Sequence, residues 1–467
     1  MTPNESINRV PLMIVLISGA FVAILNQTLL GTALPHIMKD LEIDAATAQW
    51  LQSIFMLVNG IMIPVTAFLI ERFTTRALFL TAMGSFALGT LVAAIAPDFT
   101  VLMAGRVLQA AGAGIMMPLM QTVMFLIFPI EKRGSAMGMF GLVIAFAPAI
   151  GPTLSGWLVE NFPWRSLFYV VLPIAIIDII VAYKILVNVT KQTYPKVDVP
   201  SIILSTLGFG GLLYGFSMAG DANYGWGSPM VYIPLIVGAI TLFIYIQRQL
   251  KLPKPILEFR IFKYSMFSLT TAIGMISFLA MIGGAIVLPI MMQDYLGFTA
   301  FESGLALLPG ALLMGIMNPI TGRLFDKFGA KWLAITGLAL VTVTTLMFSN
   351  LSPETTFTYI TVVNAFRMFG IAMVMMPVTT AGLNQLPGKF IPHGTAMNNT
   401  MRQMSGAIGT ALLISIMLNQ AVPSEGLTGM IKGVNDSFLV AGIISGVGFV
   451  LAFFIKHSRP EVENTAS

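Results

Sequence analysis

Charged side chains are scarce in this chain, and the few that lie within or beside long apolar stretches are the ones that could do chemistry. Three are carboxylates, namely Asp178 in LPIAIIDIIVAY, Asp294 in IMMQDYLG and Glu302 in TAFESG. Burial favours the neutral form of a carboxylic acid and a nearby arginine favours its charged form, a competition that suits reversible protonation. We predict that one of them binds and releases a proton, with Asp178 the deepest by sequence. Alternatively, Asp178 pairs with Lys184 at the inner surface.

Arg106 is an embedded cation that lies a turn or so inside the apolar segment GRVLQAAGAGIMMP. A cation at the centre of a bilayer costs roughly 2.5–3.5 kcal/mol, and less towards either end, so such a residue normally faces a cavity and has a partner. Gln109 follows three residues later and would share its face of a helix. The alternative is an anchor whose guanidinium reaches water at the outer end of the segment.

Uncharged polar side chains in apolar stretches could hydrogen-bond a neutral or polar ligand. They occur in LNQTLLGTALPHI and in NNTMRQMSGAIGTALL, where Arg402 is again an embedded cation. Plain polar contacts between helices are the alternative. The candidates for lining a ligand cavity are Asn26, Gln27, Thr28, Gln109, Asn398 and Arg402.

Other kinds of chemistry find little support in the sequence. There is no cysteine, so thiol chemistry and cysteine metal sites are excluded, and His36, His393 and His457 are too few and too scattered for a metal cluster. No ATP-binding signature of the G-x-x-x-x-G-K-[ST] type occurs, so any pumping must use an ion gradient or a partner. An enzyme is the least expected function, because no nucleophile–base–acid grouping stands out.

The elements that must position these residues are membrane-spanning helices. The chain has 467 residues, of which 56% are hydrophobic and 10% are charged, whereas a soluble domain has roughly 25% charged residues. One bilayer crossing needs about 20 apolar residues, and the first stretch lacks a clean cleavage site, so we expect it to be retained. The fourteen predicted spans are 11–34, 49–69, 77–96, 101–126, 134–159, 166–187, 198–218, 229–248, 265–292, 301–324, 332–349, 356–378, 394–418 and 437–455.

The placement of Lys and Arg predicts the orientation. With both termini in the cytoplasm, most of these residues fall in cytoplasmic segments, and only Lys39, Arg165 and Lys432 fall in outer ones. Cytoplasmic loops normally carry the excess of Lys and Arg. The net charge of +5 therefore indicates membrane topology and gives no reason to expect a nucleic acid as partner.

Internal repeats divide the chain. KRGSAM at Lys132–Met137 has a counterpart in PHGTAM at Pro392–Met397, and LIERFTTR at Leu69–Arg76 has one in LFDKFGAK at Leu324–Lys331. Two repeat pairs in the same order predict parallel halves of six helices each. Two extra spans lie between the halves. The predicted units are a bundle at 11–187, an insertion at 198–249 and a second bundle at 264–456.

The segment FAPAIGPTLSG carries small residues and prolines at helical spacing. Ala147, Gly151 and Ser155 recur every four residues in one row, and Pro148, Pro152 and Gly156 do so in another. This spacing gives a smooth stripe for close helix packing. Each proline removes an intrahelical hydrogen bond and favours a kink. The candidates for packing, and for the gating that the resemblance stated below implies, are Gly141, Pro148, Gly151, Pro152 and Gly156.

The segment GRLFDKFGAK joins two predicted helices. Gly322 allows close approach of helices, and Gly329 permits a tight turn. Asp326 can pair with a basic group or lie near a helix N-terminus, while cations such as Lys331 keep the loop inside. A latch at this loop is what the family resemblance stated below implies.

The first-half copy of this loop, AFLIERFTTR, is degenerate. It retains acidic and basic residues at Glu71 and Arg72, but alanine and threonine replace its two glycines. A basic loop that only sets topology is therefore the alternative to a latch in this copy.

These motifs resemble those of the major facilitator superfamily, and the six-plus-two-plus-six plan resembles its fourteen-helix drug:proton antiporter-2 family. FAPAIGPTLSG is similar to the antiporter signature that is assigned control of the outer seal, and GRLFDKFGAK to the loop motif that favours the outward-facing state. GRVLQAAGAGIMMP is similar to the fourth-helix motif, whose arginine is implicated in proton coupling. The resemblance covers almost the whole chain and implies an all-α major facilitator fold.

One position departs from the family pattern. Asn26 stands where many members have aspartate, and an asparagine cannot bind a proton or attract a cationic drug by charge. This variant, with WLQSIFMLVNGIMIPVTAFLIERF after it, looks closest to lincomycin-efflux-type members.

The resemblance implies a proton-coupled antiporter that exports small amphiphilic drugs, lincosamides among them, across a bacterial cytoplasmic membrane. Such a protein needs no cofactor, and its partners are a small-molecule substrate, protons and lipids, with no obligate protein partner. The first alternative is a proton-coupled exporter of an endogenous metabolite or lipid. A proton symporter and a non-transporting sensor or scaffold are further alternatives, disfavoured by the antiporter signature and by the paired repeats with embedded arginines.

Overall fold

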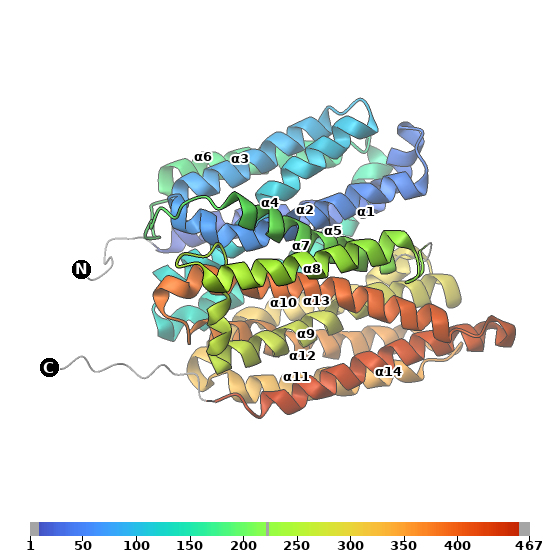
Figure 1. The fold of residues 1–467 in the computed structure, drawn as a ribbon. Coiled ribbons are helices and arrows are strands. Elements are labelled where there is room, and N and C mark those ends of the chain that lie inside the picture. The colour runs from blue at the N-terminus through green and yellow to red at the C-terminus, as the bar shows by residue number, and fades with distance from the viewer. Residues whose placement is uncertain (1–8, 221–223, 457–467) are drawn as a thin grey trace.

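The computed structural model of the chain describes residues 9–220 and 224–456, and these form long helices that run alongside one another (Figure 1). In this part of the chain, 14 helices are long and apolar enough to cross a membrane, which confirms the predicted spans. The helices are α1 (Arg9–Asp40), α2 (Ala45–Arg72), α3 (Thr75–Ala94), α4 (Phe99–Ile127), α5 (Arg133–Asn161), α6 (Ser166–Ile185), α7 (Val199–Ala219), α8 (Pro229–Lys251), α9 (Ser265–Ile290), α10 (Ala300–Phe328), α11 (Ala330–Met347), α12 (Phe357–Leu383), α13 (Ile391–Gln420) and α14 (Gly426–Ala452).

The helices pack in a first and a second bundle. Helices α1 to α6 contact one another, and so do α9 to α14. The bundles meet along a seam where α5 lies against α10 and α12, and where α13 lies against α2 and α4. This grouping is consistent with the six-plus-two-plus-six plan.

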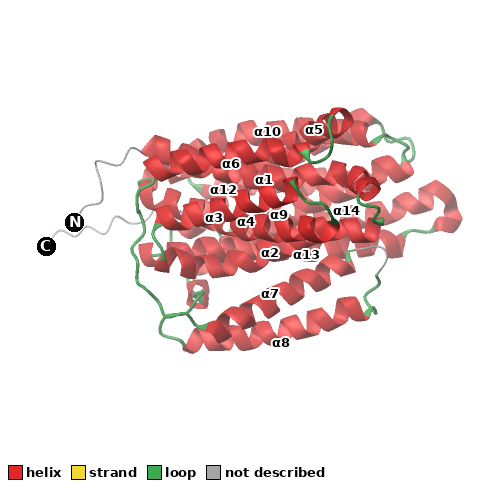
Figure 2. Ribbon diagram, turned by 90° about the horizontal axis from the view of Figure 1, so that it is seen from above, coloured by secondary structure: helices red, strands yellow, loops and turns green. Residues whose placement is uncertain are grey.

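The two inserted helices form a hairpin along one edge of the molecule (Figure 2). Helix α7 packs on both α2 and α13, whereas α8 packs mainly on α7. Close packing within the hairpin depends on small residues, because a Cβ on Gly238 would lie 2.7 Å from the backbone nitrogen of Leu212. The outer face of α8 exposes Ile240 and Phe243, as expected for a helix that faces lipid.

A bidentate ion pair ties the start of α7 to the end of α8. Arg248 donates to Asp198 through Nε at 3.0 Å and through Nη2 at 2.8 Å. The hydrogen bond from the guanidinium of Arg248 holds the pKa of the Asp198 carboxyl below its usual value.

Arg248→Gln is expected to lower the free energy of unfolding by about 0.5 kcal/mol, because partly exposed ion pairs contribute little. The pKa of Asp198 is lower in the folded protein, so the pair stabilises the fold fully above about pH 4 and less as the pH falls through the lowered value. Thermal denaturation of wild type and variant at several pH values measures this difference. A difference that is as large at pH 3 as at pH 7 would contradict the assignment.

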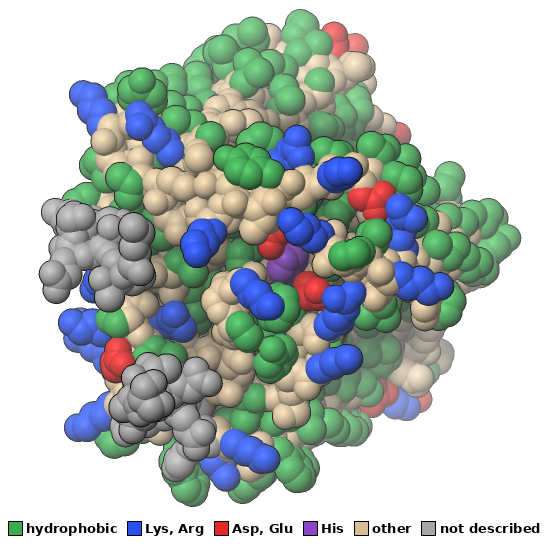
Figure 3. Space-filling view, turned by 60° about the vertical axis from the view of Figure 1, so that its left-hand side comes forward, with side chains coloured by type: hydrophobic (Ala, Val, Ile, Leu, Met, Phe, Trp, Pro, Cys, Tyr) green, Lys and Arg blue, Asp and Glu red, His purple; other side chains and the backbone are tan. Residues whose placement is uncertain are grey.

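One end of the bundle, called the inner end, carries the start of α1 and the end of α14 (Figure 1). Lys and Arg side chains are spread over this face (Figure 3). The opposite, outer end includes Lys39 at the end of α1 and Arg165 before α6. That the inner end faces the cytoplasm stays a prediction.

Candidate functional site

The bundles lie very close together where the start of α5 meets the end of α10. The Asp326 carboxylate accepts hydrogen bonds from the backbone N–H groups of Gly134 at 2.7 Å and Ser135 at 2.8 Å, and from the Ser135 hydroxyl at 2.5 Å. These groups belong to the first turn of α5, where N–H groups lack helical partners and the helix dipole favours a negative charge. A Cβ on Gly322 would collide with the carbonyl oxygen of Gly134, so glycine is needed for this approach.

The contact of α5 with α10 continues to the middle of both helices. Asn318 donates through Nδ2 to the carbonyl oxygen of Gly141 at 2.8 Å. A Cβ on Gly138 would lie 2.5 Å from the carbonyl oxygen of Asn318, and one on Gly315 would collide with the Phe146 ring. Gly141 therefore takes part in the seam between the bundles.

The outer half of the same seam is different. An added Cβ on Gly156 of α5 or on Gly304 of α10 would meet no atom within 4 Å, apart from neighbours in its own helix. Pro148 and Pro152 are exposed. The contact between α5 and α10 is thus concentrated in the inner and middle parts of the helices.

The buried row of the FAPAIGPTLSG segment packs within the first bundle. A Cβ on Gly151 would collide with the Thr28 hydroxyl of α1. One turn further, Ser155 donates to the carbonyl oxygen of Leu29 at 2.5 Å and accepts from the Thr32 hydroxyl at 2.5 Å. This row therefore holds α5 against α1, and it places Thr28 in a helix contact.

Hydrogen bonds from α13 close the other side of the seam. Asn399 donates through Nδ2 to Gln121 Oε1 at 2.7 Å. One helical turn towards the inner end, the hydroxyls of Thr122 and Thr395 lie 2.7 Å apart. All four residues lie in the inner halves of α4 and α13.

The degenerate loop copy also contacts the second bundle. Glu71 Oε1 lies 3.0 Å from His393 Nε2 at the start of α13. Arg72 beside it donates to the carbonyl oxygen of Pro195 at 2.7 Å, in the connection between α6 and α7. A histidine partner for Glu71 was not anticipated from the sequence.

The complete loop copy turns at a glycine. Gly329 ends α10 with a φ of 79°, a conformation that glycine adopts without the cost that a Cβ imposes. Lys331 follows in the first turn of α11 and is half-buried.

Arg106 is fully buried, with 0% of its surface exposed. Its Nε donates to the carbonyl oxygen of Leu51 at 3.1 Å and its Nη1 to Gln109 Oε1 at 2.9 Å. Gln109 in turn donates to Thr90 Oγ1 at 2.9 Å, and the guanidinium lies 4.3 Å from the centre of the Phe55 ring. The alternative of an anchor that reaches water is therefore wrong.

Arg106→Lys is expected to reduce transport about tenfold or more, because an ammonium cannot donate to Leu51 and Gln109 in the same geometry while stacking on Phe55. Each hydrogen bond from a charged group contributes about 1.5–3 kcal/mol. Initial rates of substrate uptake into everted vesicles measure the loss. Arg9→Lys, at the exposed start of α1, is the control, and equal rates for the two variants would contradict the prediction.

Two further arginines are buried in the second bundle. Arg367 donates to the carbonyl oxygen of Ala280 at 2.7 Å and to Asn364 Oδ1 at 3.1 Å. Arg402 has only the Met375 sulfur, at 3.7 Å, as a hydrogen-bond acceptor among the described residues, and it lies 5.0 Å from the centre of the Phe278 ring. Its Nε and Nη1 are buried and have no hydrogen-bond partner among the described residues. Arg402 thus has donors to offer to a ligand.

Asp178 lies in the middle of α6 and faces α1, with 5% of its surface exposed. The Ser18 hydroxyl donates to its Oδ1, and its Oδ2 has no hydrogen-bond partner among the described residues. A Cβ on Gly19 would lie 2.9 Å from that oxygen. The partner of Asp178 is therefore Ser18 of α1, and the alternative pairing with Lys184 is wrong.

The other two carboxylates occupy different surroundings. Asp294 is exposed in a short π-helix, Met291–Tyr295, that follows α9. Glu302 forms a capping box with Thr299 at the start of α10, accepting from the Thr299 backbone N–H at 2.8 Å. Both lie at the outer end and away from the buried polar groups, and their proton-coupling role stays a prediction.

A set of buried polar atoms without hydrogen-bond partners among the described residues lies on α1, α2, α4 and α13, of which α2, α4 and α13 meet at the seam. Three of the residues concerned, Asn26, Asn398 and Arg402, were predicted to line a cavity, whereas Gln27 is half-buried. Two others, Asn59 and Gln121, were missed, although each is a polar residue inside a predicted span. The atoms are Asn26 Nδ2, Asn59 Oδ1, Gln121 Nε2, Asn398 Oδ1, Arg402 Nε and Arg402 Nη1.

Buried polar atoms without partners are costly in a protein interior. Their presence on α1, α2, α4 and α13, which include both bundles, indicates a place where a polar ligand would find donors and acceptors. These atoms, called the polar band, together with Asp178 and Arg106, form the candidate functional site.

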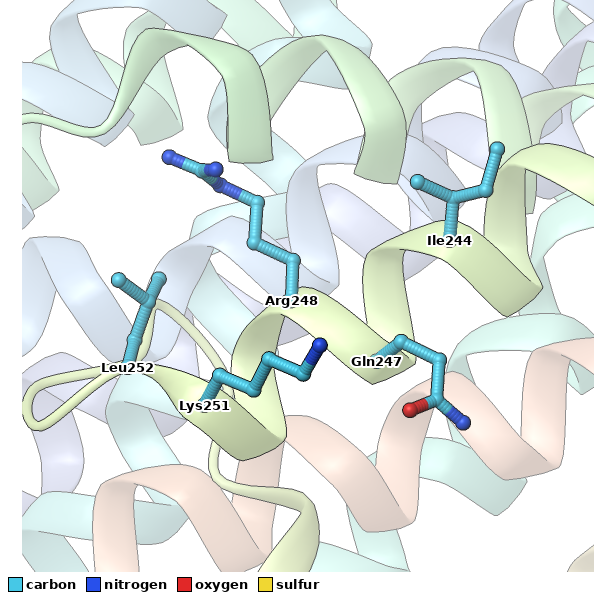
Figure 4. Close-up of a pocket in the computed structure, with 5 residues that line it drawn as sticks. All are labelled: Ile244, Gln247, Arg248, Lys251 and Leu252. Carbon is cyan, nitrogen blue, oxygen red and sulfur yellow. The ribbon is translucent and has the colours of Figure 1, made fainter.

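A metal site and a surface pocket are two other kinds of possible functional site. Within residues 9–220 and 224–456, no group of three or more His, Asp or Glu residues could hold a metal ion. A surface pocket at the inner end of α8 is formed by that helix alone and lies outside the seam (Figure 4). Its basic side chains are typical of helix ends at a membrane surface. The pocket is lined by Ile244, Gln247, Arg248, Lys251 and Leu252.

Comparison with known proteins identifies the family. Residues 16–410 match the model of the Major Facilitator Superfamily. The chain is 57% identical over 464 residues to the uncharacterized transporter YcnB of Bacillus subtilis, with 98% of each chain covered. It is 45% identical over 467 residues to the lincomycin resistance protein LmrB of Bacillus subtilis, again with 98% of each chain covered.

A solved structure agrees with this match. The human organic anion transporter MFSD10 superposes with a TM-score of 0.71 at 13% identity, over 95% of this chain and 99% of that one. At this identity the likeness concerns the fold alone. The family model matches most of the chain, and LmrB is similar over almost the whole chain. The chain therefore belongs to the major facilitator superfamily of membrane transporters, as a member with 14 spanning helices.

Proposed function

We propose that the protein exports small amphiphilic drugs, lincosamides among them, in exchange for protons. The observation that carries this proposal is the polar band, whose atoms lack hydrogen-bond partners among the described residues and lie on helices of both bundles. Uncharged amides with a single buried guanidinium suit a ligand that is polar but not strongly cationic. Similarity to a lincomycin resistance protein over almost the whole chain supports the same substrate class.

The arrangement of the seam supports alternating access of the polar band. With the inner end facing the cytoplasm, the bonds of Asp326, Gln121 and Asn399 close the site to that side. Rocking of the bundles breaks these bonds and opens the inner side while the outer halves of α5 and α10 come together. Gly156 and Gly304, which have open space around them, leave room for that movement.

Asp178 is the group we assign to the proton. Its Oδ2 is buried and partnerless among the described residues, and a carboxyl in such surroundings binds a proton readily. A proton taken up from outside neutralises Asp178, and its release inside resets the carrier. Because Asp178 hydrogen-bonds Ser18 of α1, the helix that also carries Asn26, protonation and substrate contact act on the same helix.

The driving force for export is modest. One proton moving down a membrane potential of 100 mV supplies about 2.3 kcal/mol, to which a pH gradient adds. At about 1.4 kcal/mol per tenfold ratio, this supports a gradient of neutral drug of about fortyfold per proton.

Efflux from energised cells tests the substrate class. Cells that express the protein and are loaded with a lincosamide or with a cationic dye are expected to extrude the lincosamide faster than cells with an empty vector, and an uncoupler should abolish the difference. Asn26→Asp is expected to increase extrusion of the cationic dye, because it adds a negative charge to the polar band. Unchanged efflux of every drug would favour the export of an endogenous metabolite or lipid instead.

A further inference from the structure

His393 occupies a junction of three parts of the molecule. It lies in the first turn of α13 with 4% of its surface exposed. On one side is the end of α2 in the first bundle, and on another is the connector, residues 252–264, which leads from the inserted hairpin into α9. None of the functional assignments above uses this histidine.

Both ring nitrogens of His393 are engaged. The backbone N–H of Glu258 in the connector donates to Nδ1 at 3.3 Å. Because Nδ1 accepts this bond, the ring hydrogen of the neutral form is on Nε2, which donates to Glu71 Oε1 at 3.0 Å. The ring thus links the connector to the first bundle.

The equivalent place in the first repeat holds a permanent cation. In the aligned segments KRGSAM and PHGTAM, Arg133 corresponds to His393. Arg133 donates through Nη1 to Asn384 Oδ1 at 3.0 Å, while Asp326 takes the N–H groups of the two residues that follow it. The second repeat therefore places an imidazole, which can gain and lose a proton, where the first has a guanidinium that keeps its charge.

The surroundings single out Glu71 as the carboxylate that faces the ring. In the connector, the Glu258 carboxylate is turned to Arg260, whose Nε is 3.6 Å away. On α2, Arg72 donates to Pro195, and before α13, Lys389 lies over the Phe390 ring. On the other side of α13, Gly394 is packed against Leu383, Leu386 and Phe267, which carry no charge.

We propose that Glu71 and His393 form a proton-binding site that controls opening at the inner end. A proton from the inner aqueous phase binds to Nδ1 of His393, and this is the only covalent change. Nδ1 then carries a hydrogen and can no longer accept from Glu258, so the connector is released. At the same time the bond from Nε2 to Glu71 becomes an ion pair, which strengthens the contact between α2 and α13.

The direction of the effect follows from these two changes. Acidification of the inner side holds the seam closed, and neutral or alkaline conditions allow it to open. This role rests on the proposed antiport: the site slows proton entry once protons have accumulated inside. The partly exposed Glu71 side chain, at 19% of its surface, gives the proton access from water.

Distance measurements across the inner end test the site without any substrate or proton flux. The chain has no native cysteine, so spin labels can be placed at Phe73→Cys after α2 and Gly388→Cys before α13. Both positions are exposed, and Gly388 has no atom within 4 Å of an added Cβ. Double electron–electron resonance between pH 8 and pH 6 is expected to show the ratio of closed to open molecules rising about fivefold as the pH falls.

Three variants separate the site from other titrating groups. His393→Gln, which cannot gain a charge, is expected to lose most of the pH response. His393→Arg, which copies Arg133, is expected to give the closed distribution at both pH values. His36→Gln, at the exposed outer end of α1, should respond like wild type. A full pH response in His393→Gln would overturn the proposal. Where His393→Gln does not fold, a full pH response in His393→Arg would overturn it.

A second readout concerns the connector. In wild type, the protection factor of the Glu258 amide against hydrogen exchange should fall at pH 6 relative to pH 8, because protonated Nδ1 no longer accepts from it. In His393→Arg the amide should be unprotected at both values. Equal protection in wild type at the two pH values would contradict the proposal, even if drug export itself were disproved.

Discussion

Gly322→Val is expected to reduce drug export at least tenfold and to keep the inner half of the seam from closing. A Cβ at this position collides with the Gly134 carbonyl oxygen, which belongs to helix backbone and cannot rotate away. Overpacking of this kind costs about 1–3 kcal/mol. Because the cost applies only to the state in which α5 and α10 touch, it shifts the ratio of closed to open molecules by about 5- to 150-fold.

Drug accumulation in expressing cells and labelling of a cysteine at Gly388 from the inner side would measure the two effects. Gly84→Val in α3 is the matched control, since nothing lies within 4 Å of its added Cβ and α3 takes no part in the seam. It has the same change in helix propensity and should export normally. If both variants export at the wild-type rate, the inner closure is not part of the transport cycle.

Asp178→Asn is expected to abolish proton movement coupled to the drug. The asparagine keeps the size of the side chain and can still accept from Ser18, so the contact of α6 with α1 remains. It cannot take up a proton, and a carrier without its titrating group cannot couple the two fluxes. Exchange of labelled for unlabelled drug across the membrane should continue, because that exchange requires no net proton transfer.

The comparison of variants locates the coupling residue. Asp294→Asn, in the exposed π-helix, should retain coupled proton movement if Asp178 is the carrier. Glu354→Gln, in an exposed loop, controls for the loss of an acidic group. Wild-type coupling in Asp178→Asn would remove Asp178 from the mechanism, and loss in Asp294→Asn would move the assignment there.

The membrane-spanning plan could be predicted from the sequence because the bilayer leaves little choice. A chain that crosses hydrocarbon must satisfy its backbone hydrogen bonds within each span, so long apolar runs become helices. The 14 observed helices follow those runs. The close approach at Gly322 was also readable, since a glycine inside a helix next to a charged loop signals a backbone contact.

The orientation of the helix faces could not be predicted. These helices are apolar on all sides, so periodicity does not show which face meets the partner bundle. The bond between Gln121 and Asn399 joins residues 278 positions apart, and neither local spacing nor composition indicates it. The same holds for His393, whose partners Glu71 and Glu258 come from two separate segments.

Two alternatives were decided by side-chain contacts. Lys184 lies six residues after Asp178, and sequence alone permitted a pair, but Asp178 faces α1 and bonds Ser18. Arg106 lies near the outer end of α4, where an arginine can reach water, but here it turns inward to Leu51 and Gln109. In both cases the decisive factor is the rotation of a helix against its neighbours.

Proton flux in proteoliposomes is the most direct test of drug:proton antiport. Purified protein would be reconstituted with a pH-sensitive dye under an imposed pH gradient, and a lincosamide would be added to one side. The account predicts drug-dependent proton movement in wild type and none in Asp178→Asn. If correctly folded wild-type protein shows no drug-dependent proton flux with all of the drugs tested, the account is contradicted.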